Sequence, residues 1–353
     1  MSLTSYERIS RILKRQAVDR IGLYEHFWSD TFKVWPIKED FEEILGHDII
    51  ECWTFDMMAD LDFGKELISE DEDTITQKDG NYAVLRRHKK HDTTPEHIDF
   101  EIDDRYKWLE RIKPILTASN KRIDFDKYKS KMAYAKKRDM FFCWSGLSVF
   151  EIMHTVVGHV NMLMGMIDDP KWISDMAMTY AKLTVELQEI LFEKVGYPDG
   201  FFYYEDMGYK NSPFFSKEMY YEFFFPAHKH LIDYAKSINR PVIMHSCGFV
   251  EPLIPGMLKA GIDCLQVIEV KAGMDLLRIH KNYKDVLSLM GGIDVRALYS
   301  NDKSIIDKEL ESKIPIVKEG FGYVLHSDHS IPKTVNYDTY RYFIEKGLKL
   351  GKY

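Results

Sequence analysis

Eight short apolar runs, most of them followed by a helical stretch, constrain the fold of this chain more than any other feature. They lie at residues 21–26, 48–53, 140–144, 200–206, 241–245, 263–268, 286–290 and 322–326. Runs of this length, closed by polar residues or glycine, are typical of strands buried in a parallel sheet. Strands that alternate with helices predict an α/β fold, specifically a (β/α)8 TIM barrel. A doubly wound sheet is the alternative, but no glycine-rich phosphate turn follows any run.

The composition favours one large soluble domain. With 353 residues, 45% of them hydrophobic, the chain can bury the core of a single barrel over residues 1–353. The net charge is −8 and the basic residues are scattered, which argues against a nucleic-acid surface. Four cysteines do not make a disulfide scaffold in a chain this long, and no run has signal-peptide or membrane character. We therefore expect a cytoplasmic protein that binds neither nucleic acid nor membrane.

The pattern changes after the second run, over residues 57–104. Asp79-Gly80-Asn81 is a turn signal that precedes an apolar stretch, and residues 97–102 alternate apolar and polar side chains. Such alternation is typical of antiparallel strands with one solvated face. We predict an antiparallel β-hairpin inserted after the second strand, acting as a lid or as a contact in a homodimer.

The run at 241–245 leads into His245-Ser246-Cys247-Gly248. Because side chains alternate along a strand, His245 and Cys247 point to the same side. Barrel chemistry is found where strands end, and imidazole with thiolate suits a borderline-soft ion, zinc first. Polar side chains also follow other runs, at Glu25, His26, Tyr204, Glu205, Asp206, Glu269, Asp294, His326, Asp328 and His329.

Because barrel strand ends converge on one mouth, four of these side chains are expected to bind a single metal ion. The expected ligands are His245, Cys247, Glu269 and His329. Each residue alone has a plainer alternative role. Glu269 can pair with Lys271, Asp294 can cap a turn, and His326 and His329 can be surface histidines. Their joint occurrence at successive strand ends favours a site.

These motifs resemble the uroporphyrinogen decarboxylase superfamily, and within it the cobamide-dependent methyltransferases. The resemblance covers nearly the whole chain and rests on residues 8–20, 94–100, 146–170, 204–208, 245–248, 291–294 and 326–332. Members of the superfamily are (β/α)8 barrels. The decarboxylase itself holds its polycarboxylate substrate with arginines in an N-terminal loop. Here residues 25–30 contain no arginine and two acids, which would repel such a substrate and argues against porphyrin decarboxylation.

The methyltransferase branch binds zinc through His-x-Cys, a later Glu in some members, and a distant Cys. His245 and Cys247 match this motif, Glu269 falls where the Glu is expected, and His329 stands at the position of the distant Cys. Histidine is still a good zinc ligand. The exchange brings the formal charge of zinc and its ligands to about zero, so a bound thiol would ionise more readily but attack more weakly.

The resemblance implies transfer of a methyl group from a corrinoid (methylcobalamin) protein to a thiol or similar acceptor. The chain has no Asp-x-His-x-x-Gly cobalamin signature, so the corrinoid is expected on a partner protein. Glu205 and Asp206 are expected to act as general base or to orient the acceptor, and Tyr204, Asp294 and His326 to bind substrate. Two alternatives remain: a non-catalytic barrel that docks the corrinoid protein, and a uroporphyrinogen-decarboxylase-like lyase acting on another small acid.

Overall fold

The structure is a computed structural model that describes residues 2–37, 39–91 and 94–353. Within these residues, parallel strands form one eight-stranded sheet in the order β1-β12-β11-β10-β9-β8-β7-β2. The strands are β1 (Gly22–Leu23), β2 (Ile49–Trp53), β7 (Phe141–Leu147), β8 (Gly200–Tyr204), β9 (Val242–Ser246), β10 (Cys264–Val267), β11 (Ser288–Gly291) and β12 (Tyr323–Leu325). The predicted α/β architecture is confirmed, and the curled parallel sheet is TIM-barrel-like.

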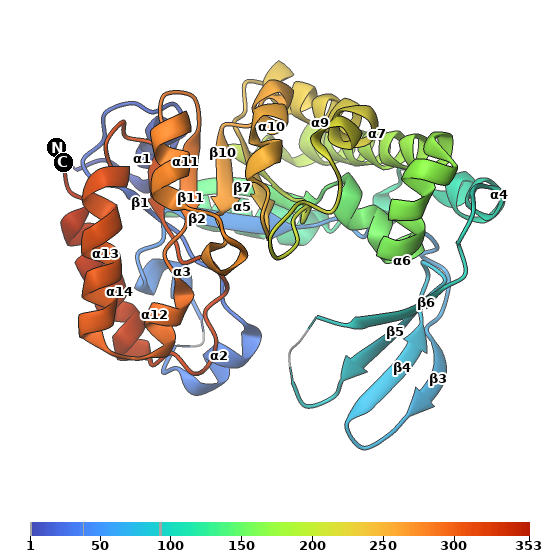
Figure 1. Cartoon of the computed structure of the whole chain (residues 1–353), viewed down its shortest axis with the longest axis horizontal. Coiled ribbons are helices and arrows are strands. Elements are labelled where there is room, and N and C mark those ends of the chain that lie inside the picture. Colours follow the sequence, from blue (N-terminus) through green and yellow to red (C-terminus); the bar gives the residue numbers. More distant parts are fainter. Residues whose placement is uncertain (1, 38, 92–93) are drawn as a thin grey trace.

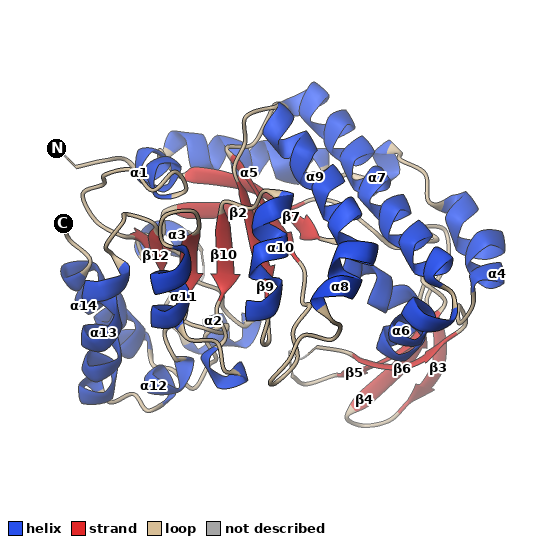
Figure 2. Cartoon of the chain, turned by 45° about the horizontal axis from the view of Figure 1, so that its top comes forward, coloured by secondary structure: helices blue, strands red, loops and turns tan. Residues whose placement is uncertain are grey.

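Helices pack around the outside of this sheet (Figure 2). The helices of the described residues are α1 (Ser5–Ile12), α2 (Ser29–Val34), α3 (Phe41–Ile44), α4 (Arg105–Lys107), α5 (Phe125–Lys137), α6 (Val149–Asp168), α7 (Pro170–Val195), α8 (Lys217–Met219), α9 (Phe225–Ser237), α10 (Ile254–Ala260), α11 (Leu276–Tyr283), α12 (Val295–Tyr299), α13 (Lys303–Val317) and α14 (Tyr337–Leu350). Two π-helical turns, Trp108–Ile112 and Tyr220–Phe224, extend α4 and join α8 to α9. None of the helices in the described residues combines the length and the apolar character needed to cross a bilayer.

The inside of the sheet is apolar toward the beginnings of the strands. Inward side chains there, such as Ile49, Phe202 and Ile243, form one buried cluster with Ile9 and Ile12 of α1. Helix α1 is amphipathic and buries this face, so it covers the barrel at the end where the strands begin. The opposite end, where the strands finish, is left for polar side chains.

The outer strands of the sheet, β1 and β2, meet at Asp48. The backbone N–H of Asp48 donates to the carbonyl of Leu23 (2.8 Å), and the Asp48 carboxylate accepts from the Leu23 N–H (2.8 Å). That fully buried carboxylate also binds the guanidinium groups of Arg8 (2.7 Å) and Arg20 (2.8 Å). One residue therefore joins the two edges of the sheet and ties α1 to them.

The insertion after β2 is larger than the predicted hairpin. In the described part of residues 57–104, which leaves out residues 92–93, it is a four-stranded antiparallel sheet in the order β3-β4-β5-β6. Its strands are β3 (Glu66–Glu70), β4 (Thr74–Lys78), β5 (Ala83–His88) and β6 (Glu96–Phe100). Figure 1 shows this sheet extending from the barrel beside α6. Gly158 in α6 permits the contact, because a Cβ there would lie 2.4 Å from the Phe100 ring.

Candidate metal centre

Polar side chains replace apolar ones where the barrel strands end. Each of the adjacent strands β8, β9 and β10 carries a polar side chain two residues after an inward apolar side chain. Tyr204 follows Phe202, His245 follows Ile243 and Gln266 follows Cys264. Tyr204 and Gln266 lie directly beside His245 in the strand registers. Burial of polar groups costs free energy unless they are hydrogen-bonded, so this layer indicates a site rather than a device for stability.

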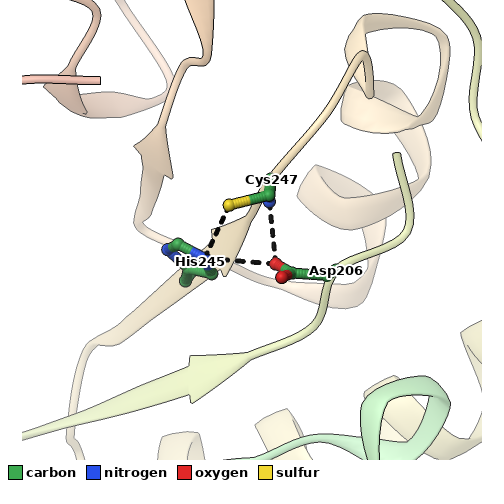
Figure 3. A group of neighbouring side chains, drawn as sticks. All are labelled: Asp206, His245 and Cys247. Atoms are coloured by element: carbon green, nitrogen blue, oxygen red, sulfur yellow. Dashed lines mark hydrogen bonds and ion pairs between the residues drawn. The ribbon is translucent and has the colours of Figure 1, made fainter. Parts of the chain in front are cut away.

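Three side chains at the ends of β8 and β9 point toward one another (Figure 3). His245 Nε2 lies 3.1 Å from Asp206 Oδ1 and 3.3 Å from Cys247 Sγ. The Cys247 N–H donates to the same Asp206 oxygen at 2.8 Å. One ligand atom from each residue lies within 4.8 Å of the other two, so the three residues could hold one metal ion. We call these residues the Asp–His–Cys group.

Gln266 fixes the orientation of the His245 ring. His245 Nδ1–H donates to the Gln266 side-chain oxygen, which leaves Nε2 facing Asp206 and Cys247. The Gln266 amide nitrogen in turn donates to His326 Nε2 (3.1 Å) and approaches His26 Nδ1 (3.4 Å). A hydrogen bond to the second ring nitrogen is the usual way in which proteins orient a metal-binding histidine.

The charges of the group favour a cation at His245 Nε2. Burial lowers the pKa of His245, but the adjacent Cys247 and Asp206 raise it more, so the pKa lies well above its ordinary value. Burial and the negative charge of Asp206 raise the pKa of the Cys247 thiol to about 11. The site therefore stabilises positive charge between the three ligand atoms, whether a proton or a metal ion supplies it.

The loop after β9 is held against its neighbours at Gly248. This residue has φ of +79°, and a Cβ on it would lie 2.2 Å from the carbonyl carbon of Gly208. Its N–H donates to the Glu269 carboxylate at 2.7 Å, and the other Glu269 oxygen lies 3.2 Å from Lys271 Nζ. Glu269 thus binds Gly248, the residue after Cys247, and orients the loop that carries Cys247. Its two carboxylate oxygens are occupied by Gly248 and Lys271.

Tyr204 and His326 belong to the buried polar layer. The Tyr204 hydroxyl lies 2.7 Å from His26 Nε2 and donates to Glu51 at 2.8 Å, and its ring centroid is 4.8 Å from that of His245. His326 is fully buried, and burial, followed by the charge of His26, lowers its pKa well below the ordinary value. Neither residue is a surface side chain.

The remaining predicted residues lie outside the group. Glu205 is fully buried, where its carboxylate accepts from the N–H groups of Phe150 (3.0 Å) and Glu151 (3.1 Å) at the start of α6. Asp294 caps α12 and pairs with its neighbour Arg296 at 2.6 Å. The His329 ring lies 6.1 Å from that of Trp28, and among the described residues it is not one of the grouped ligands.

Sequence reasoning missed several residues that build this site. Gln266 carries no charge and lies inside an apolar strand, so only the strand register reveals it. Glu151 is in the first turn of α6, its backbone N–H donates to Glu205, and its carboxylate lies 3.0 Å from His154 Nε2. Burial, then the charges of Asp206 and Glu205, raise the pKa of Glu151 to about 8. The position of Glu151 shortly after the end of β7 is the sequence feature that could have identified it as a site residue.

The sequence profile described as uroporphyrinogen decarboxylase (URO-D) matches residues 147–347, more than half of the chain. Among solved structures, a methyltransferase from Methanosarcina mazei shares 14% identity over 98% of both chains with a TM-score of 0.65, which shows a common fold. An uncharacterized protein (13% identity, 47% and 44% covered, TM-score 0.26) and a Xaa-Pro dipeptidase with bound methionine (12%, 64% and 58%, 0.31) share little of it. Comparison with curated protein sequences gives no match.

Proposed function

Since the chain belongs to the uroporphyrinogen decarboxylase family, we propose that it is a metal-dependent methyltransferase of that family. It would move a methyl group from a corrinoid carried by a partner protein to a thiol or similar acceptor. The observation that carries this proposal is the Asp–His–Cys group at the mouth of the barrel. The lack of arginine in residues 25–30 argues against decarboxylation of a polycarboxylate.

The donor set and spacing fit a zinc-type ion. Tetrahedral zinc with bonds of about 2.0–2.3 Å separates its ligand atoms by roughly 3.3–3.6 Å. The separations from His245 Nε2, 3.1 Å to Asp206 and 3.3 Å to Cys247, are a few tenths of an ångström shorter, and all three ligand atoms lie within 4.8 Å of one another. Three protein ligands leave a fourth position open, as in catalytic rather than structural zinc sites. When bound, such an ion would acidify an acceptor thiol and hold its sulfur.

The protein residues supply orientation and charge balance. Gln266 keeps His245 Nε2 directed toward Asp206 and Cys247, and Glu269 holds the loop that carries Cys247. Burial, followed by the charges of Asp206 and Glu205, raises the pKa of Glu151 above its ordinary value, which disfavours a further negative charge beside Asp206. We assign Asp206 as a ligand rather than a general base, and Glu205 to the support of α6.

The experiment measures bound metal and methyl transfer in the same preparations. We compare the wild type with His245→Ala and Cys247→Ala, and use Cys264→Ala as the matched control because Cys264 is a buried strand cysteine outside the group. The wild type and Cys264→Ala should bind zinc and transfer methyl groups from methylcobalamin to a thiol. His245→Ala and Cys247→Ala should lose both properties.

Two results would count against the proposal in different ways. Unchanged metal content in both ligand variants would show that the group does not hold the ion. Metal binding that depends on both residues, without transfer to any thiol, would favour the lyase alternative or the non-catalytic docking barrel.

A further inference from the structure

A cavity of about 370 Å³ lies between the inserted sheet and the barrel. We call it the insert cavity. Its walls come from the ends of β2 and β7, from α6, and from the face of the inserted sheet that turns toward the barrel; they include Trp53, Phe55, Met58, Arg87, Trp144 and Glu151. The volume falls within the range of small-molecule sites, about 300–1,000 Å³, and is too small for a corrinoid-bearing protein.

The insert cavity borders the Asp–His–Cys group. Glu151 lines the cavity, and its backbone N–H donates at 3.1 Å to Glu205, the residue before Asp206. Trp53 also lines the cavity, and its ring centroid lies 4.6 Å from that of Tyr204, which in turn lies 4.8 Å from that of His245. Asp206, His245 and Cys247 do not line the cavity themselves, so a molecule held there would approach them past Tyr204 and Glu151.

The apolar lining of the insert cavity indicates what kind of ligand scaffold it can bind. The apolar part of the wall includes the aromatic rings of Trp53, Phe55 and Trp144 and the side chains of Met57 and Met58. Such walls favour a flat aromatic body, through ring contacts and sulfur–aromatic contacts. A short aliphatic molecule would leave much of this apolar surface uncovered.

The lining also places one cation at the outer part of the cavity. Arg87 follows Leu85 by two residues on β5, so both side chains face the barrel, and the Arg87 side chain is exposed. Among the described residues Arg87 has no ion pair, whereas its neighbour Arg86 pairs with Glu96 at 2.5 Å on the other face. The cavity also contains Asp79, whose carboxyl group the Arg87 charge reaches, and the exposed Arg87 guanidinium is suited to binding a carboxylate.

We propose that the insert cavity binds the methyl acceptor, and that this acceptor is a small aromatic thiol with a carboxylate. The carboxylate binds Arg87, the ring lies against Trp53, and the sulfur points toward Cys247. In the transfer the sulfur forms a bond to the methyl carbon, the methyl–cobalt bond breaks with both electrons remaining on cobalt, and the thiol proton leaves to solvent. The assignment as acceptor rests on the proposed function; binding in the cavity does not.

A second cavity, of about 410 Å³, is lined by Cys247 itself and supplies the competing site. Its lining includes Lys210, Lys271 and one aromatic residue, Tyr209. Lys271 is already paired with Glu269 at 3.2 Å. This cavity offers less aromatic surface, and it would favour a short aliphatic anion instead.

The test measures binding of three probes by titration calorimetry to the zinc-loaded protein. The probes are 3-mercaptobenzoate, thiophenol and mercaptoacetate. We expect 3-mercaptobenzoate to bind most tightly. Arg87→Met should weaken it about tenfold or more, because a charge-assisted contact is lost, and should leave thiophenol unchanged. The matched variants Arg86→Met and Lys271→Met should bind 3-mercaptobenzoate like the wild type.

The inference is overturned if Arg87→Met and Arg86→Met behave alike, or if mercaptoacetate binds best and depends on Lys271. Its failure can be told apart from that of the proposed function. Arg87-dependent binding without methyl transfer would support a ligand site in the insert cavity and contradict the proposed methyltransferase function. Transfer to other thiols with no effect of Arg87→Met would keep the methyltransferase and remove the cavity site.

Discussion

Replacement of Gln266 by leucine should weaken metal binding although Gln266 is not itself a ligand. In the wild type, His245 Nδ1–H donates to the Gln266 side-chain oxygen, and Nε2 faces Asp206 and Cys247. Leucine has a similar volume but accepts no hydrogen bond. The buried N–H of His245 would then lack a partner, which costs about 1–3 kcal/mol, and the ring can instead carry its proton on Nε2. A metal ion must displace that proton or restore the ring orientation.

The expected magnitude follows from the same contact. Loss of a hydrogen-bond partner behind a metal ligand costs about 10–100-fold in metal affinity, or about 1.4–2.7 kcal/mol. The assay is competition for zinc with a chromophoric chelator at fixed pH. Gln188→Leu is the matched control, since Gln188 is also fully buried and hydrogen-bonded, to the Tyr203 hydroxyl at 2.9 Å.

The comparison separates orientation of the ligand from general destabilisation. Gln188→Leu should lower the thermal midpoint and keep the zinc affinity of the wild type. Gln266→Glu, which retains an acceptor for His245, should bind zinc more tightly than Gln266→Leu. Equal zinc affinity in Gln266→Leu and the wild type would refute the proposed role of this contact.

Three further predictions concern stability. Burial, assisted by the charge of His26, lowers the pKa of His47 to about 3, whereas the pKa in the unfolded chain is about 6.5. As the pH drops, the unfolded chain therefore binds the proton first, and the free energy of unfolding falls between pH 6.5 and pH 3. The slope from this residue is about 1.4 kcal/mol per pH unit, and His47→Leu should reduce it in urea titrations at pH 7 and 4.5. Asp48→Ala should lower the free energy of unfolding by about 3–5 kcal/mol, because it removes the buried carboxylate that Arg8 and Arg20 share where β1 and β2 meet, and leaves Arg8 with Asp19 alone. An effect below about 1 kcal/mol would contradict this role. Glu205→Gln should lower the thermal midpoint and keep bound zinc, whereas Asp206→Asn should lose bound zinc and keep the thermal midpoint. Loss of zinc in Glu205→Gln would contradict the assignment of Asp206, rather than Glu205, as the ligand.

The barrel strands could be predicted because each is a buried apolar run with a polar end. The family resemblance was also correct, since its motifs lie at those ends. The insertion was underestimated for a physical reason. All residues of β3 are exposed, so this strand has no alternation of buried and solvated side chains from which to recognise it.

The arrangement of the site was less accessible from sequence. Glu205 and Asp206 are adjacent and chemically alike, yet the first turns to α6 and the second to His245, because β8 ends at Tyr204 and the alternation no longer applies beyond it. Glu269 follows Ile268, whose φ of +60° is unusual for a β-branched residue, and it is directed to the N–H of Gly248. Such loop conformations depend on tertiary contacts that strand patterning does not encode.

X-ray absorption by the zinc-loaded protein tests the metal centre most directly. The Asp–His–Cys group predicts a single sulfur neighbour at about 2.3 Å and nitrogen or oxygen neighbours at about 2.0–2.1 Å. The sulfur signal should vanish in Cys247→Ala and persist in Cys264→Ala. A spectrum without sulfur in the wild type, or one that Cys247→Ala leaves unchanged, would contradict the proposed centre.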